Sequence, residues 1–314
     1  MKMFTKLTHP FLFQGNTKLP HYFEGWYFKQ VNLALNRTIS FILGISTNKE
    51  DPHAFIQVIH SHPLKTYYFS YPLDRFIQHE DGYRLGSSSF SEKHLSLNIQ
   101  EKNFTCIGNL HFNQTTALKH NLYMPNIMGP FAYLGKMECN HGVVSMHHTV
   151  DGTLNMNNER WNFVKDIGYI EKDWGRSFPR RYIWLQGNHF NNPNTHLMVS
   201  VADIPFGFFH FEGLIAQLNH PLHTRRLATY TFAHKSKLIK SENGFNLILK
   251  QGRIRWVLDI QIHEKADLVS PQNGKMKNTI KEGLGGQIRL RVFNQDSLLF
   301  EDVSQHCGIE IEGY

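Results

Sequence analysis

The sequence predicts an all-β protein built from antiparallel strands. Of its 314 residues, 13% are aromatic and only 19% are charged, which is typical of a folded chain with half-buried pleated surfaces. Apolar and polar side chains alternate with period two in several segments, as they do on the two faces of a strand. No window of helical length shows the 3.6-residue period of an amphipathic helix. These three observations together favour β-structure throughout.

The strand pattern is clearest in three segments. Residues 38–46 (TISFILGIS) are almost continuously apolar, as expected of a strand buried on both faces. Residues 253–263 alternate Ile, Trp and Leu with Arg, Asp, Gln and His, and residues 287–293 alternate in the same way. Turn-forming runs such as Glu80-Asp-Gly82 separate the strands. Residues 265–287 break this rhythm, and we expect a long surface loop there.

A weak internal echo predicts a duplicated β-domain. Trp26-Tyr-Phe-Lys-Gln resembles Trp184-Leu-Gln-Gly-Asn, and each Trp precedes a loop and a second apolar strand. The offset, 184 − 26 = 158 residues, is within one residue of half the 314-residue chain. We therefore expect an N-terminal β-domain over residues 1–170 and a C-terminal β-domain over residues 171–314. The Gly175–Pro179 corner lies near this boundary.

Charge and cysteine content limit the class of protein. The formal net charge is +7, but Lys and Arg are scattered without the basic stripe of a nucleic-acid-binding protein. The three cysteines are odd in number and lack CxxC spacing, which favours a reducing compartment over a disulfide framework. No apolar run approaches the roughly 18 residues of a membrane span. We expect a soluble cytoplasmic protein with no nucleic-acid partner, and we leave open peripheral membrane contact and the oligomeric state.

The densest group of reactive side chains lies just after the middle of the chain. On a strand, Tyr169, Glu171 and Asp173 would share one face, and Lys172 and Trp174 would share the other. The Cα atoms of the two acidic residues would lie roughly 6.5–7 Å apart, from a rise of about 3.3 Å per residue. If dehydrated, one of the two carboxyl groups would hold a proton and could serve as an acid. The alternative is a solvated outer face, or ion pairs of the two carboxylates with Arg180 or Arg181.

Two further strand segments have the composition of a binding-cavity wall, with aromatic surfaces beside a few polar groups. In the C-terminal half, Tyr182, Trp184 and Gln186 share one face. The corresponding face near the N-terminus presents one carboxylate and two aromatic side chains: Glu24, Trp26 and Phe28. A buried carboxylate there would need a partner or a proton. The alternative is that each Trp only plugs the closed end of a barrel.

Motifs for metal, cofactor or nucleophile chemistry are missing from the sequence. The 20 histidines include the pairs His60-Ser-His62 and His147-His148, but no HExxH or comparable spacing supplies a further ligand. Nothing resembles GxSxG, a P-loop or a GxGxxG motif after a strand. We expect scattered surface or core histidines, no metal and no cofactor.

Three motifs resemble the tocopherol cyclase family. They are Phe23-Glu-Gly-Trp-Tyr-Phe-Lys29, Glu171-Lys-Asp-Trp-Gly-Arg-Ser-Phe-Pro179 and Tyr182-Ile-Trp-Leu-Gln186. The resemblance extends from about Pro20 to Gly313 and is sharpest in the first two motifs. Plant and cyanobacterial members usually carry Asn at the position of Asp173, so one polar group of the central motif differs in this chain.

The resemblance implies a fold and a chemistry. The implied fold is two tandem lipocalin-like antiparallel β-barrels or sandwiches packed together, related to carotenoid hydratase and AttH-type proteins. The implied chemistry protonates a prenyl double bond, and a phenol oxygen then captures the tertiary cation and closes a chromanol ring. Such a reaction needs an acid, a dry cavity and aromatic faces. The candidate acids are Glu24, Glu171 and Asp173, and the candidate ligand-binding residues are Trp26, Phe28, Trp174, Tyr182, Trp184 and Gln186.

The predicted function is binding of a hydrophobic, prenylated or aromatic small molecule in a β-barrel cavity. If the protein is catalytic, we expect acid-assisted cyclisation or hydration by an intramolecular lyase or isomerase. The alternatives are a non-catalytic carrier with the same cavity and an interaction module. Enzyme and carrier both place Trp184, Gln186 and at least one candidate acid inside an enclosed pocket, whereas an interaction module places them outside.

Overall fold

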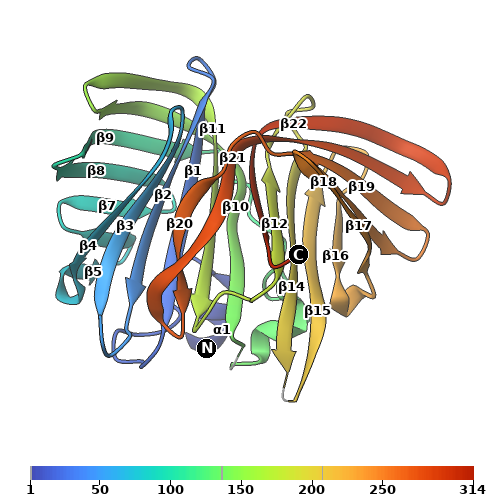
Figure 1. The fold of residues 1–314 in the computed structure, drawn as a ribbon, viewed down its shortest axis with the longest axis horizontal. Helices are drawn as coiled ribbons and strands as arrows, with labels where there is room; N and C mark the ends of the chain where they lie inside the picture. Colours follow the sequence, from blue (N-terminus) through green and yellow to red (C-terminus); the bar gives the residue numbers. More distant parts are fainter. Residues whose placement is uncertain (1, 136, 207) are drawn as a thin grey trace. The chain divides into compact units, whose positions relative to one another are not determined.

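The computed structural model describes residues 2–135, 137–206 and 208–314, which form almost only β-structure (Figure 1). The chain divides into two compact units. Unit 1 comprises Met1–Phe178 and Val269–Thr279, and unit 2 comprises Pro179–Leu268 and Ile280–Tyr314. The all-β prediction is confirmed. In the described residues, no helix is long and apolar enough to cross a membrane.

Unit 1 is built on one antiparallel sheet with the strand order β4-β3-β2-β1-β11-β10-β9-β8-β7-β6-β5. One face of this sheet carries a single core to which strands from β1 to β11 contribute, so the sheet curls around its own apolar face. Its elements are α1 (Lys2–Thr8), β1 (Phe23–Asn32), β2 (Arg37–Ser46), β3 (His53–Ser61), β4 (Leu64–Pro72), η1 (Leu73–Arg75), β5 (Phe76–Gln78), β6 (Gly82–Leu85), β7 (Ser88–Ser91), β8 (His94–Glu101), β9 (Phe104–Asn113), η2 (Gly129–Tyr133), β10 (Cys139–Met156) and β11 (Glu159–Gly175).

Unit 2 is built on a second antiparallel sheet with the order β16-β15-β14-β12-β22-β21-β19-β18-β17, to which β13 and β20 add at β22 and β21. Its buried hydrophobic residues, aliphatic and aromatic, form a separate core. The elements are β12 (Tyr182–Gly187), β13 (His189–Phe190), β14 (His196–Phe206), β15 (Phe209–Asn219), β16 (Arg225–Ala228), η3 (Thr229–Thr231), β17 (His234–Ser241), β18 (Gly244–Gln251), β19 (Ile254–Gln261), β20 (Ala266–Gln272), β21 (Lys275–Asn294) and β22 (Ser297–Glu312).

The two sheets share one topology. In unit 1 the first strand, β1, pairs with β2 and with the last strand of the sheet, β11. In unit 2 the first strand, β12, pairs with β14 and with the last strand, β22. The tandem architecture is thus confirmed at the level of strand order. The predicted boundary after residue 170 lies inside β11, whereas the compact units divide between Phe178 and Pro179.

The predicted equivalence of Trp26 and Trp184 holds for the strands but not for their faces. Trp26 belongs to the core of unit 1. In β12 the core of unit 2 contains Ile183 and Leu185, so Trp184 points to the opposite face. Because side chains alternate with period two, an offset of one residue between the repeats reverses every side chain.

The prediction of a long surface loop over residues 265–287 is wrong. This segment forms β20 and the first part of β21, and its tip, Val269–Thr279, belongs to unit 1. There Val269 N donates to Gln57 Oε1 at 2.8 Å and Ser46 Oγ donates to Gly274 O at 2.6 Å. Buried polar residues within these strands, such as Ser270, hide the alternation on which the prediction depended.

A short helix, α1, precedes the first strand and was not predicted. It contains only seven residues, fewer than a periodicity window needs, because two helical turns already span about seven residues. The chain continues from α1 to residues Leu12–Gly15. The backbone of these residues forms hydrogen bonds with the buried side chains of Glu24 on β1 and Lys172 on β11.

Candidate functional site

Strand β11 carries most of the predicted reactive groups, and it presents different groups on its two faces. It lies between β1 and β10, so both of its edges are paired. One face carries Ile170, Lys172 and Trp174, which contact the core of unit 1, and the other carries Glu171 and Asp173. The predicted division of these faces is confirmed. The candidate acids therefore lie in two separate networks on opposite sides of one sheet.

Glu24 lies on the core face of β1 and is completely buried. Its carboxylate accepts hydrogen bonds from Gln14 N at 2.8 Å, from Gly15 N at 3.0 Å and from the Tyr22 hydroxyl. Lys172 Nζ completes the set at 2.6 Å. Every one of these contacts is with a donor, so both carboxyl oxygens of Glu24 act as hydrogen-bond acceptors. This arrangement favours a structural role for Glu24.

Lys172 is also completely buried and forms the charged partner of Glu24. Its Nζ donates to Leu12 O at 2.5 Å and lies 4.9 Å from the ring centroid of Trp26 and 5.0 Å from that of Trp174. Burial lowers the pKa of Lys172 to about 8, although Glu24 acts in the opposite direction. Both indole rings thus already stabilise a cation that belongs to the protein.

Phe28 and Trp26 are part of an aromatic cluster that fills the core of unit 1. The ring of Phe28 lies 6.4 Å from Phe11, 5.7 Å from Phe90 and 6.5 Å from Phe112. Trp26 Nε1 donates to Phe11 O at 2.8 Å. These contacts pack both side chains into the core of unit 1, and ligand binding by them stays a prediction.

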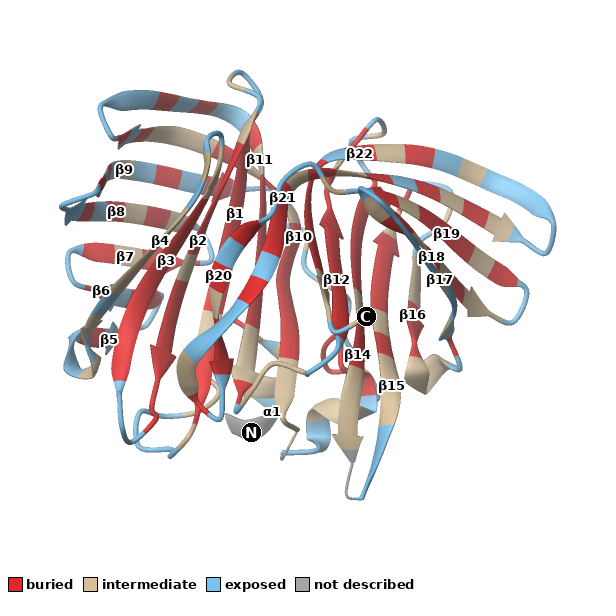
Figure 2. Cartoon of the chain, in the orientation of Figure 1, coloured by how far each residue is buried: buried red, intermediate tan, exposed pale blue. Residues whose placement is uncertain are grey.

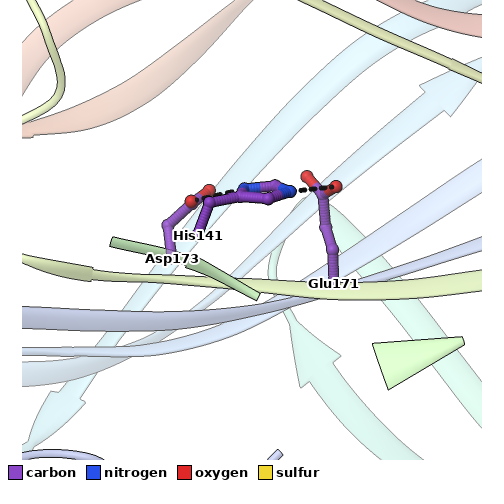
Figure 3. Close-up of side chains that lie close together, drawn as sticks. All are labelled: His141, Glu171 and Asp173. Atoms are coloured by element: carbon purple, nitrogen blue, oxygen red, sulfur yellow. Dashed lines mark hydrogen bonds and ion pairs between the residues drawn. The ribbon is translucent and has the colours of Figure 1, made fainter. Parts of the chain in front are cut away.

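The opposite face of β11 contains a network of three titratable groups, His141, Glu171 and Asp173 (Figure 3). His141, on β10, pairs directly with Asp173 across the two strands. Its imidazole lies between the two carboxylates, with Nδ1 2.8 Å from Asp173 Oδ1 and Nε2 3.3 Å from Glu171 Oε2. The Tyr169 hydroxyl donates to Glu171 Oε2 at 2.5 Å. His141 is thus an ion-pair partner of both carboxylates.

Electrostatics make His141 a cation. Burial alone would lower its pKa, but the adjacent charges of Glu171 and Asp173 outweigh burial and raise the pKa to about 10. Burial, reinforced by the charge of Glu171, raises the pKa of Tyr169 well above its usual value, so its hydroxyl stays a donor. Glu171 is nearly inaccessible, with 6% of its side chain exposed, whereas 26% of Asp173 is exposed.

The same three residues are close enough for a metal site, since their ligand atoms lie within 4.8 Å of one another. Their orientation, however, points each imidazole nitrogen at a carboxylate (Figure 3). Metal binding needs a deprotonated imidazole nitrogen that faces the ion together with the carboxylates. With both nitrogens directed at anions, the arrangement of His141 is that of a proton-sharing bridge.

The predicted wall residues of the C-terminal half lie together on one face of β12, the strand buried on both sides in Figure 2. Tyr182 donates through its hydroxyl to Glu310 Oε2 at 2.6 Å. Trp184 lies against Gly308, where a Cβ atom would meet the indole at 2.6 Å. Gln186 is completely buried. The structure therefore groups Tyr182, Trp184 and Gln186 within unit 2, and Trp184 depends on a glycine for its position.

Sequence reasoning missed several members of these networks. Alternation predicts the face of Lys172 correctly, but it does not indicate Glu24 as its partner, because the two residues are 148 positions apart. His141 was overlooked among the other histidines. Only the register of β10 and β11 reveals it, and that ladder contains three register shifts that sequence spacing does not show.

Comparison with known proteins supports the resemblance found in the sequence. Residues 120–205 match the family model described as tocopherol cyclase-like. The matched segment contains His141, Glu171, Asp173 and Trp184. The family resemblance is thus confirmed. No curated protein matches this chain by sequence.

Solved structures confirm the fold. A putative AttH from Nitrosomonas europaea is 13% identical with a TM-score of 0.55, and the match covers 92% of each chain. CghA is 10% identical with a TM-score of 0.58, covering 93% of this chain and 89% of CghA. A kievitone hydratase from Nectria haematococca is 10% identical with a TM-score of 0.51, covering 92% and 88%. At these identities the likeness concerns the fold, which is of the AttH type with tandem lipocalin-like units.

Proposed function

We propose that this protein binds a hydrophobic, prenylated or aromatic small molecule and catalyses its acid-assisted hydration or cyclisation. The observation that carries this proposal is the buried network of Tyr169, Glu171, His141 and Asp173, which holds a cationic imidazole between two carboxylates. The tocopherol cyclase-like match over residues 120–205 supports the same chemistry.

Within this network we assign the proton donor to Asp173. The Glu171 carboxylate already accepts a hydrogen bond from the Tyr169 hydroxyl, pairs with His141 and is almost inaccessible to solvent. Asp173 uses only Oδ1 for His141 and is partly exposed, and within the described residues no hydrogen bond reaches its Oδ2. Its protonated form would transfer the proton from Oδ2 to an alkene carbon. The carboxylate that remains would be stabilised by the His141 cation at 2.8 Å.

The proton balance closes in both versions of the reaction. The proton adds to one alkene carbon as the π bond breaks, and the cation forms on the other carbon. In a cyclisation, the phenol oxygen of the same molecule bonds to the cation and releases its proton. In a hydration, the oxygen of a water molecule bonds to the cation and releases a proton instead. The released proton returns to Asp173, so the protein is regenerated without a cofactor.

Binding is tested first. Native mass spectrometry of protein purified from its own host should show a retained apolar molecule, and added prenylated quinols should raise the melting temperature. If no molecule is retained and the quinols leave the melting temperature unchanged, the binding part of the proposal fails.

Catalysis is tested by turnover of prenylated quinols in D2O, which introduces deuterium at the protonated carbon. Asp173→Asn should lower kcat about 10²–10⁴-fold, as expected on removal of a general acid, while the ligand still binds. Asp74→Asn, at an exposed carboxylate on η1, serves as the control and should retain full activity. Unchanged deuterium incorporation in Asp173→Asn would exclude Asp173 as the acid, and binding without turnover in the wild type would leave a carrier.

A further inference from the structure

An open cleft of about 580 Å³ lies at one end of the unit 2 sheet. It forms where the end of η3, the β18–β19 turn and the end of β21 come together. The lining is made of two arginines, four neutral polar or small residues and two apolar side chains: Arg225, Arg253, Thr231, Gln251, Gly252, Asn294, Phe232 and Ile254. None of these residues belongs to the acid network of β10 and β11.

The charge of this cleft is entirely positive. Arg225 and Arg253 are its only charged lining residues, and no carboxylate lies among them. Every ion pair found for an arginine in the described residues involves Arg37, Arg289 or Arg291. Two guanidinium groups without carboxylate partners in one cleft offer paired donors for an anion.

Phe232 supplies an apolar surface at the rim of the same cleft, in an unfavourable conformation. It follows η3 with φ +63°, the left-handed region that glycine occupies more readily than a bulky side chain. Its side chain is also 91% exposed, so packing within the protein does not compensate for the strain. Backbone strain that packing does not offset clusters at functional sites, and here it occurs in the lining that also contains Arg225 and Arg253.

Two hydrogen bonds fix the backbone segments around the cleft, and neither of them uses the side chain of Arg225, Arg253 or Phe232. Gln251 Nε2 donates to Thr231 O at 2.7 Å, which ties η3 to the β18–β19 turn. Gln295 N donates to Arg253 O at 2.7 Å, which ties this turn to the β21–β22 turn. The backbone of the cleft is therefore connected before any ligand arrives.

We propose that this cleft binds a small organic anion with an aromatic or aliphatic body. The anionic group would lie between Arg225 and Arg253, and the apolar body would lie against Phe232 and Ile254. The ligand class follows from the lining, since a carboxylate or phosphate matches the guanidinium donors and an apolar body matches the phenyl ring. This would be a second ligand site, in addition to that of the proposed reaction.

The test is isothermal titration of the full chain with three naphthalene probes. Of these, 2-naphthoate and 1-naphthyl phosphate are anions, and 2-naphthalenemethanol is a neutral control. We expect saturable binding of at least one anion, at least tenfold tighter than the neutral alcohol and weakened by added salt. The tighter anion identifies the preferred headgroup. Equal binding of the alcohol, or no saturable binding of either anion, would overturn the proposal.

Variants connect this binding to the cleft. Arg225→Gln and Arg253→Gln should each weaken binding of the anion about tenfold, whereas Arg180→Gln, at an exposed arginine outside the cleft, should not. Phe232→Gly should weaken binding and yet raise the melting temperature, because glycine relieves the left-handed strain. Unchanged affinity in both cleft arginine variants would place the probe elsewhere and reject the site.

Discussion

At the scale of single residues, His141 shows how neighbouring charges can outweigh burial. The imidazole is enclosed by protein, yet Glu171 and Asp173 approach it from both sides, and its pKa rises to about 10. His148 is the contrasting case, because burial without a carboxylate neighbour lowers its pKa to about 3. At neutral pH His141 is thus a cation and His148 is neutral, although both lie on β10, and only their three-dimensional neighbours distinguish them.

The raised pKa of His141 predicts a pH dependence of stability. Its pKa is about 10 in the folded protein and about 6.5 in the unfolded chain. The native state therefore binds the additional proton between these values. The contribution of His141 to the free energy of unfolding is complete below about pH 6.5 and decreases as the pH rises toward 10, by about 1.4 kcal/mol per pH unit.

Urea unfolding between pH 6.5 and 8 measures this slope. Lys172, whose pKa is lowered to about 8, adds stability with rising pH only above that value. Other buried histidines also titrate near the lower end of this window, so the difference between the wild type and His141→Gln isolates the contribution of His141. We expect the wild type to lose stability more steeply than His141→Gln across the window. Parallel curves for the two proteins would contradict a cationic His141.

At the scale of elements, β11 carries a buried base on one face and two carboxylates on the other, because successive side chains of a strand point to opposite faces. Its core face bears Lys172, and its other face bears Glu171 and Asp173, one residue away on each side. The strand can carry both because β1 and β10 satisfy its backbone on either edge. The Glu24–Lys172 pair further links β1 to β11 on the core side.

Lys172→Met tests that link. Removing the ammonium group would leave Glu24 as a buried carboxylate without its charged partner, and we expect a loss of about 3–5 kcal/mol in the free energy of unfolding. The double variant Glu24→Gln/Lys172→Met should recover much of this loss, because neither buried charge remains. Denaturant unfolding of the three proteins measures both effects, and a single variant as stable as the wild type would refute the proposed coupling.

At the scale of the whole molecule, the chain repeats one strand order twice, but the repeats are not separate in sequence. Unit 1 includes Val269–Thr279 from the C-terminal half of the chain. Gly274 lies at the tip of this hairpin with φ +74°, where a Cβ atom would meet the carbonyl carbon of His21 at 2.2 Å. Close backbone approach therefore requires glycine here.

Gly274→Ala should destabilise the association of this hairpin tip with the rest of unit 1. We expect a loss of about 2–3 kcal/mol from the left-handed strain and the backbone clash together. Hydrogen exchange should increase in the amides of residues 269–279. Gly252→Ala is a matched control, since Gly252 also has a positive φ, +55°, but no atom within 4 Å of its Cβ position. Equal losses in both variants would show that strain alone, without the close approach, accounts for the effect.

The all-β class, the tandem repeat and the concentration of reactive groups around β11 can all be predicted from the order of the residues. Composition, period-two alternation and a half-length echo depend on local chemistry, which the order of residues contains directly. Even the separation of Lys172 from Glu171 and Asp173 follows from alternation alone.

Which of these groups meet depends on how the strands pair in three dimensions. The Glu24–Lys172 pair and the His141 bridge connect residues on different strands, and their pairing depends on strand register. The repeat likewise predicted matching roles for Trp26 and Trp184, yet an offset of one residue placed them on different faces relative to their cores. Register and bulges are set by packing of the whole sheet, and therefore they, rather than motif spacing, determine the chemistry of this protein.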